Sequence, residues 1–415
     1  MRILFIAYYY PPLQGPGVTR AVNLVKYLRR AGHDVSVLTH SYRGDRTGDP
    51  GLLRVHDPSF NCQRSGWRRP AWFCRRAGVE ILNRSGIYAS IFGAWEKRVL
   101  ARESRILEVA RPDVILATYP PVETLRVAMR LAKKAKRPLV ADFRDGLLFE
   151  AIESRRLRRF ACVREAYAGI ERQTVAAAAA LVTVSEPLSD YFRRAYPGSR
   201  VITVANGFDP DESAMPLPEV TLEPGCFHIV HSGRFSLSDS GCSIAPLVQA
   251  VQALLAARPE LARTLRLHFL GELNRREKGM LAGLARRGVA RLHGQVSRAQ
   301  ALAWQRRAGV LLLVTAADRS SVATTKLFEY LQARRPILAL TGRTAAAAIV
   351  ASTRSGWVAS PRSAPEIEET LERLIDDPDR DGRVDLSAAA VRGSSFAAGL
   401  GPLLDELRRL QNGGG

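Results

Sequence analysis

The chain has 415 residues, of which 46% are hydrophobic and 7% aromatic, so it is long enough for two domains with separate cores. This composition excludes a disordered chain, and five widely spaced cysteines argue against a disulfide framework. The net charge of +21 lies mostly in the first half, because residues 1–205 hold 35 Lys and Arg against 18 Asp and Glu. Nucleic acid, an anionic membrane and a phosphorylated substrate each fit this charge, as does a solvated basic surface without a partner.

An unbroken apolar run at residues 2–9 opens the chain and predicts a buried parallel strand. Prolines and glycines then break the run, helical spacing follows at residues 19–31, and residues 34–39 predict a second strand. This order is typical of the start of a doubly wound α/β domain. The N-terminus lacks the cleavage region of a signal peptide, and no apolar run reaches the roughly 18 residues of a membrane span. We therefore expect a cytoplasmic protein that is soluble or peripheral to a membrane.

The remaining predicted strands form two series that alternate with helical segments. The first series continues at residues 113–118, 138–143, 180–185 and 201–206. After a stretch rich in Gly, Pro and acidic residues, a second series is expected at 227–233, 265–271, 289–294, 310–316 and 336–340. The sequence thus predicts two Rossmann-like, doubly wound α/β domains at residues 1–207 and 208–390, with a ligand cleft between them. Residues 391–415 are expected to form a helix that packs back toward the first domain, followed by a disordered glycine tail.

The loop after the first strand is rich in glycine and directly precedes a helix. Backbone N–H groups around Gly15 and Gly17 could therefore take an oxygen of a phosphate or a sugar. The loop has neither the GxGxxG spacing of a dinucleotide site nor the spacing of a P-loop, which argues against both ligand classes. A simple tight turn explains the same glycines equally well.

Three charged residues stand at the end of the strand predicted at 138–143. Asp142, Arg144 and Asp145 are the candidate catalytic residues, because a polar group at a strand end can position an acceptor hydroxyl or act as a general base. For Asp145, capping of the next helix is an equal alternative.

The segment ATTKLFEYLQARRPILAL at residues 323–340 predicts a helix that packs on a sheet yet carries charges in its first two turns. Thr325 and its neighbours can cap this helix, whose N-terminus carries about half a positive charge, so Lys326 completes an anion site suited to a diphosphate. Glu329 could accept hydrogen bonds from the two vicinal hydroxyls of a ribose. The alternative is an i,i+3 surface pair of Lys326 with Glu329. Arg234, at the end of an earlier strand, could pair with a phosphate or with a surface carboxylate.

The sequence contains no pattern that is typical of a metal site. No His or Cys pair has metal-ligand spacing, and neither of the two DPD tripeptides follows an apolar strand. We therefore predict no protein-held metal and no cofactor.

Residues 64–105 combine ten Lys and Arg with three Asp and Glu and with large apolar side chains. These apolar residues are Trp67, Trp72, Phe73, Ile87, Tyr88, Phe92 and Trp95. Such a mixture favours a helix at an anionic membrane surface, since lipid charge and interfacial burial both contribute. Nucleic acid could use the same residue types, but the chain has no known nucleic-acid module, so we expect no nucleic acid. A helical hairpin whose tryptophans fill the core is the plain alternative.

Ten stretches give the chain a resemblance that spans nearly its full length. They are YYYPPLQGPGVTR, AGHDVSVLTH, RPDVILATYPP, VADFRD, AALVTVSEPLSDYF, VITVANGFDP, IVHSGRF, LHFLGE, ARLHGQVS and TTKLFEYLQARRPILA. In them the chain resembles the retaining GT-B glycosyltransferases of the large family four, and is most similar to bacterial enzymes of extracellular polysaccharide or lipopolysaccharide assembly. The resemblance implies a GT-B fold, a sugar-nucleotide donor bound mainly by the second domain, an acceptor bound mainly by the first, and no metal.

By this resemblance Arg234 and Lys326 hold the diphosphate of the donor and Glu329 holds its ribose, while the loop at residues 15–17 approaches the phosphates and the acceptor. Two positions depart from the family pattern. The family often has a second glutamate eight residues before the ribose-binding one, where this chain has Ser321, and many relatives have a histidine near the place of Arg144. A related subset with KLFEY also lacks that glutamate, so Ser321 is compatible with donor binding.

Together these features predict a metal-independent, retaining glycosyltransferase of the hexosyltransferase type. It would move a sugar from a nucleoside-diphosphate sugar to a membrane-linked or saccharide acceptor in polysaccharide or glycoconjugate biosynthesis. The expected partners are the nucleotide sugar, a saccharide or lipid-linked acceptor, and the anionic inner face of the cell membrane, to which the protein would bind peripherally. A GT-B sugar-nucleotide epimerase and a non-catalytic sugar-nucleotide-binding subunit are the alternatives.

Overall fold

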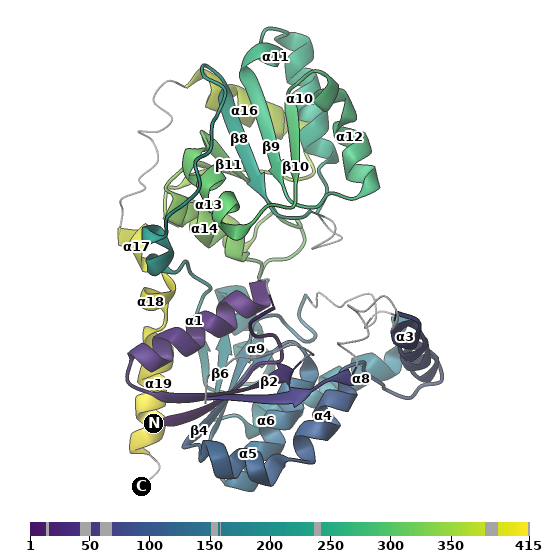
Figure 1. Ribbon diagram of the computed structural model, residues 1–415, viewed down its shortest axis with the longest axis vertical. Coiled ribbons are helices and arrows are strands. Elements are labelled where there is room, and N and C mark those ends of the chain that lie inside the picture. The colour runs from purple at the N-terminus through teal and green to yellow at the C-terminus, as the bar shows by residue number, and fades with distance from the viewer. Residues whose placement is uncertain are drawn as a thin grey trace. The chain divides into compact units, whose positions relative to one another are not determined.

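The computed structural model describes residues 1–13, 16–41, 51–58, 69–150, 157, 159–235, 242–377 and 389–413. The chain divides into two compact units, of which one is Met1–Ala205 with Leu400–Gly415 and the other is Asn206–Gly399. Each unit is built on a parallel β-sheet with helices packed against it (Figure 1).

The first unit contains a seven-stranded sheet in the order β3-β2-β1-β4-β5-β6-β7. The strands are β1 (Arg2–Ile6), β2 (Asp34–Ser41), β3 (Leu52–His56), β4 (Val114–Tyr119), β5 (Leu139–Phe143), β6 (Ala180–Thr183) and β7 (Val201–Thr203). All pairs are parallel, and Ile3 of β1 lies beside both Val35 of β2 and Val114 of β4. The strand order therefore reverses between β1 and β4, which is where doubly wound sheets bind ligands.

Helices cover both faces of this sheet, with α1 on one side and α4, α5 and α6 on the other, while α3 lies to the side of it (Figure 1). The described helices of the unit are α1 (Pro16–Arg30), α3 (Arg69–Arg84), α4 (Gly93–Leu100), α5 (Glu103–Ala110), α6 (Val122–Ala135), α8 (Ala161–Ala177), α9 (Glu186–Ala195) and α19 (Gly401–Asn412). The last of them, α19, joins the unit from the far end of the chain. There the buried Glu406 forms an ion pair with Arg200, the residue just before β7.

The second unit contains a six-stranded parallel sheet in the order β10-β9-β8-β11-β12-β13. Its strands are β8 (Phe227–Ser232), β9 (Leu265–Leu270), β10 (Ala290–Gly294), β11 (Val310–Val314), β12 (Ile337–Leu340) and β13 (Gly356–Ala359). Around them lie the helical segments η2 (Pro210–Ala214), α10 (Ala245–Ala257), α11 (Leu261–Thr264), α12 (Arg275–Arg286), α13 (Arg298–Arg307), α14 (Thr325–Ala333), α15 (Ala345–Ser352), α16 (Ala364–Asp376), α17 (Ala389–Gly393) and α18 (Phe396–Gly399). Here the order reverses between β8 and β11, so the ends of these strands are the place to look for a ligand site.

The predicted fold class is confirmed, since both units are Rossmann-like parallel sheets with helical crossovers. Two strands were not expected from the sequence, namely β3 and β13. Both lie at sheet edges, and most of their residues are only partly buried, so they lack the continuous apolar run that marks a central strand.

Candidate functional site

The strand end of β8 and the start of α14 meet in the second unit. Gly233 directly follows β8 with φ of +111°, and a Cβ at this position would overlap the side chain of Lys326. The ammonium of Lys326 donates a hydrogen bond of 3.0 Å to the carbonyl oxygen of Arg234. Burial lowers the pKa of Lys326 to about 8, because the charged form loses water. The positive φ favours glycine at this strand end, and the missing side chain leaves room for the lysine.

The first turn of α14 begins at Thr325, with Thr324 in the N-cap position. The extended backbone of Thr324 fits this role, but its side chain does not cap the helix. Its hydroxyl oxygen is buried and has no hydrogen-bond partner within the described part of the chain. The helix therefore starts where the sequence predicted, with Lys326 in its first turn.

The side chain of Arg234 does not join Lys326 in this structure. Its guanidinium forms an ion pair of 2.8 Å with Glu272, and both side chains are about half exposed. The backbone of Arg234 thus contacts the lysine, while the side chain extends to the surface.

Glu329 lies one turn further along α14 and is held by α13. Its Oε1 accepts a hydrogen bond of 2.9 Å from Nη1 of Arg298, and its Oε2 accepts one of 3.3 Å from Nε2 of Gln305. In this described region, Lys326 and Glu329 do not pair with each other, so the i,i+3 surface pair is not what places these charges. The structure brings Gly233, Lys326 and Glu329 to one end of the second sheet.

The sequence did not single out the residues around Glu329. Arg298 donates to both carboxylate oxygens of Glu212 in the short helix η2, at 2.8 to 3.0 Å. The local sequence offers one signal, the stretch SRAQ, in which Ser297 and Gln300 form a capping box and place Arg298 at the first helical position. The partners of Arg298 could not be predicted from the sequence, because they lie 86 and 31 residues away.

Asp142 lies in β5 of the first unit, and its carboxylate accepts hydrogen bonds from two other side chains. Arg20 of α1 approaches both of its oxygens, at 2.5 and 3.0 Å, and the hydroxyl of Thr118 in β4 donates to Oδ2 at 2.6 Å. Its side chain is 1% exposed. The carboxylate thus ties α1, β4 and β5 together, and no face of it is open to a substrate in this structure.

The other predicted residues of the first unit partly converge. The guanidinium of Arg144 lies so close to Gly17 that a Cβ there would overlap it, and Nε of Arg144 is 3.4 Å from Oδ2 of Asp145. Two stretches predicted independently thus come together at the ends of β1 and β5. The first helix of eight or more residues described after Asp145 is α8, whose N-cap residue is Phe160, while residues 151–156 lie outside the described part of the chain. Gly15 lies outside the described residues.

The basic stretch at residues 64–105 divides between core and surface. Trp95 is fully buried and packs edge-on against Tyr8, whose ring also contacts the half-buried Phe92. For these two aromatic residues the core alternative holds. Phe73 of α3 and Ile87, in contrast, are 60% and 57% exposed. Trp67 and the side chain of Trp72 lie outside the described residues.

No helix in the described ranges is long and apolar enough to cross a membrane. Likewise, the described His, Cys, Asp and Glu side chains contain no group of three that could hold a metal ion.

Solved structures with the same fold are similar to this chain over its whole length. A trehalose-6-phosphate structure from E. coli bound with UDP-2-fluoro glucose has a TM-score of 0.67 at 14% identity, with 98% of this chain and 99% of that chain covered. A sucrose-phosphate synthase from Thermosynechococcus elongatus has a TM-score of 0.65 at 13% identity, with 98% of this chain and 99% of that chain covered. A UDP-forming α,α-trehalose-phosphate synthase from Burkholderia xenovorans in complex with glucose-6-phosphate has a TM-score of 0.66 at 14% identity, with 99% of this chain and 100% of that chain covered. No curated protein sequence matches the chain.

The two Rossmann-like units and the family models that match them define a glycosyltransferase of the GT-B class. Residues 15–207 match the model of the glycosyl transferase 4-like domain, and residues 227–377 match that of the glycosyl transferases group 1. The chain is thus an enzyme of the group 1 glycosyltransferases. The structures similar to it that are named above are trehalose- and sucrose-phosphate synthases rather than enzymes of polysaccharide assembly.

Proposed function

We propose that this glycosyltransferase moves a sugar, with retention of anomeric configuration, from a nucleoside-diphosphate sugar to a saccharide or membrane-linked acceptor in polysaccharide or glycoconjugate biosynthesis. The observation that carries the proposal is the arrangement of Gly233, Lys326 and Glu329 at one end of the second sheet. Glycosyl transfer needs positive charge where the diphosphate leaves, and Lys326 and the N-terminus of α14 supply it. Arg234 would add a second cation if its side chain exchanged Glu272 for a phosphate. Glu329 would accept the hydroxyls of the ribose.

In the first unit, the cluster of Gly17, Arg144 and Asp145 is our candidate for acceptor recognition and for the polar group at the reacting centre. Arg144 is only 17% exposed, and its position against Gly17 keeps its guanidinium near the start of α1. We assign Asp142 a positioning role, because Arg20 and Thr118 occupy its carboxylate.

The donor site is tested by the substitution Glu329→Ala. We expect it to weaken nucleotide-sugar binding by about 1.5–3 kcal/mol, the usual value of a hydrogen bond to a charged group. Glu369→Ala on the exposed face of α16 is the matched control and should bind as the wild type does. Isothermal titration with UDP-, GDP- and ADP-sugars measures the affinities, and thermal melting checks the fold. A folded Glu329→Ala protein that binds donor with wild-type affinity would show that the site is elsewhere.

Turnover separates the proposed reaction from its alternatives. Slow release of nucleoside diphosphate from the donor, accelerated by saccharide or sugar-phosphate acceptors, is expected of a transferase. Interconversion of two nucleotide sugars would indicate an epimerase, and tight donor binding without turnover would indicate a binding subunit.

We also propose that the enzyme docks peripherally on an anionic membrane through α3. Phe73, Ala77 and Ile81 are spaced by four residues and therefore share one face of this helix. All three are exposed, Phe73 at 60% and Ile81 at 64%. Exposed Arg76 and Arg84 lie on the same helix. This is the pattern of an interfacial helix, whose apolar face enters the lipid while its basic residues meet the headgroups.

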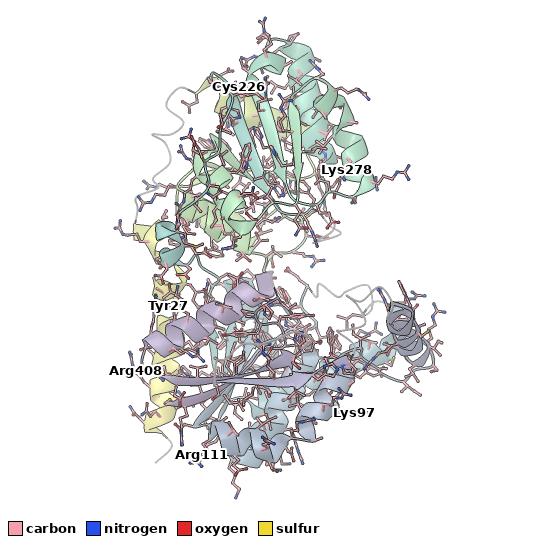
Figure 2. All side chains as sticks on the ribbon, in the orientation of Figure 1. Tyr27, Lys97, Arg111, Cys226, Lys278 and Arg408 are labelled. Atoms are coloured by element: carbon pink, nitrogen blue, oxygen red, sulfur yellow. The ribbon has the colours of Figure 1, made fainter. Side chains whose placement is uncertain are left out.

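The charge of the whole first half agrees with such a surface. Residues 1–205 carry a net charge of +17, and basic side chains such as Lys97 and Arg111 project outward from the first unit (Figure 2). A membrane-linked acceptor would then meet the enzyme at the lipid surface.

A further inference from the structure

Arg298 lies at the N-terminus of α13, where a basic residue is unfavourable unless it has acidic partners. It is the first residue of α13, and the capping box of Ser297 and Gln300 fixes this turn, with hydrogen bonds of 3.2 and 3.0 Å. The N-terminus of a helix carries partial positive charge and repels a cation. Two carboxylates offset this repulsion, because Arg298 pairs with both Glu212 and Glu329. The pKa of Arg298 is raised by these partners despite its burial.

The guanidinium of Arg298 has each of its three nitrogen atoms bound to a carboxylate. Nε and Nη2 donate to Glu212 at 2.8 to 3.0 Å, and Nη1 donates to Oε1 of Glu329 at 2.9 Å. The planar fork is therefore fixed in orientation by Glu212 and presents a single N–H to Glu329. Glu212 itself is anchored, since Arg306 donates to its carbonyl oxygen at 3.0 Å.

Both carboxylate oxygens of Glu329 accept a hydrogen bond, and each can accept one more. Arg298 occupies one acceptor site on Oε1, and Gln305, which is fully buried and also donates to Ser232 at 2.9 Å, occupies one on Oε2. An ionised carboxylate has about four acceptor sites, so one remains on each oxygen as far as the described residues are concerned. The side chain is 16% exposed, so it is not sealed off from solvent. The two oxygens of this carboxylate can therefore each accept a hydrogen bond from one of two vicinal hydroxyls.

We propose that Arg298 is a positioning residue that orients the carboxylate of Glu329 toward the ribose diol of the nucleoside diphosphate. The inference rests on the proposed donor site and names a residue on which that site depends. A lysine at this position would keep the charge, but it could not bridge Glu212 and Glu329 with a fixed fork. The recognition of the ribose hydroxyls, rather than of the phosphates, should therefore depend on an arginine at position 298.

The test compares a nucleotide with its counterpart that lacks both ribose hydroxyls. Isothermal titration of the wild type with UDP, GDP and ADP identifies the tightest of the three, and the 2′,3′-dideoxy form of that nucleotide is then titrated. We expect the wild type to prefer the ribose form, and Arg298→Lys to reduce this preference by about tenfold while its affinity for the dideoxy form stays unchanged. Arg307→Lys is the matched control, because Arg307 is an exposed arginine on the same helix, α13, and takes no part in the proposed arrangement. It should keep the wild-type preference.

Each result has a defined meaning. If the wild type binds none of the nucleotides, or binds both forms equally, the proposed donor site fails and the inference fails with it. If the wild type prefers the ribose form and Arg298→Lys keeps that preference, the inference alone is overturned. A gain in affinity of Arg298→Lys for the ribose form also overturns it, because Arg298 would then compete with the ribose for Glu329. Glu212→Gln provides a second variant if Arg298→Lys melts early, and it should reduce the same preference.

Discussion

Lys326 titrates in a range where nucleotide binding can be measured, because burial lowers its pKa to about 8. Below this pH the free protein already carries the ammonium, and a diphosphate binds without proton uptake. Above it the lysine is neutral, and binding must recover a proton, so affinity should fall by up to tenfold per pH unit. The terminal phosphate, with a second pKa of about 6, is ionised throughout this range. Isothermal titration with UDP, GDP and ADP between pH 7 and 9.5 measures the effect.

Two substitutions isolate the contribution of this residue. Lys326→Arg keeps its charge at all of these pH values and should give an affinity that does not change with pH. Lys326→Met should bind weakly and equally at every pH. If the affinity of Lys326→Met fell with pH as it does in the wild type, another group would be responsible for the pH dependence.

Asp142 illustrates how a residue with a catalytic appearance can have a structural role. Its carboxylate forms a buried ion pair with Arg20, whose Nη1 also donates to the carbonyl of Val204 at 3.0 Å. Breaking such a pair by removing one partner typically costs about 3–5 kcal/mol. We therefore expect Asp142→Asn to lower the free energy of unfolding by an amount of this order, as measured by urea denaturation. Combining Arg20→Met with Asp142→Leu should recover most of the loss, because no unpaired charge remains. A stable Asp142→Asn protein without turnover would instead assign the residue to catalysis.

At the scale of elements, α3 is the helix whose exposed apolar and basic residues we expect to dock on an anionic membrane. Its side chains Phe73 and Ile81 are 60% and 64% exposed, and each would contribute about 1.5–3 kcal/mol if buried in lipid. Basic residues near anionic lipid add about 1 kcal/mol each. The protein should therefore sediment with vesicles that contain anionic lipid, and much less with neutral ones. High salt should weaken this binding without removing it, since apolar burial is not screened.

The substitutions Phe73→Ala and Ile81→Ala together should remove the salt-resistant part of the binding. The matched control replaces Val109 and Val358 with alanine, because these are 57% and 41% exposed on other elements. Since all four side chains are exposed, the melting temperatures should stay close to that of the wild type. Vesicle binding that survives the α3 substitutions at high salt would exclude α3 as the docking element.

At the scale of the whole molecule, the sequence was sufficient for the central strands and for the start of α14. A buried parallel strand has an unbroken apolar run, and a helix start has local signals, so neither depends on distant residues. Edge strands such as β3 and β13 lack the run and were missed. Gly17 and Arg144 were each predicted as site residues, but only the fold shows that they touch.

The part of the site that could not be predicted is set by long-range pairing. A carboxylate after a strand has the same local sequence whether it faces a substrate or an arginine, and the partner of Asp142 lies 122 residues earlier. For the same reason Glu329 was predicted as a ligand residue, while Arg298, which donates to it, and Glu212, which holds Arg298, were not.

The charge distribution of the whole enzyme leads to a prediction about metal ions. A leaving diphosphate needs compensating positive charge, which an enzyme can take from a bound cation or from its own groups. Here the ammonium of Lys326 stands in the first turn of α14, whose N-terminus adds partial positive charge, and the guanidinium of Arg234 would join them on leaving Glu272. These groups should suffice, so transfer should continue in excess EDTA at a rate close to that without it. Activity that is lost in EDTA and restored by magnesium or manganese would show that the protein's own cations do not carry the leaving group alone. The control is Lys326→Met. Its transfer rate should be reduced equally with and without EDTA, because the charge that this variant lacks comes from the protein and not from a metal ion.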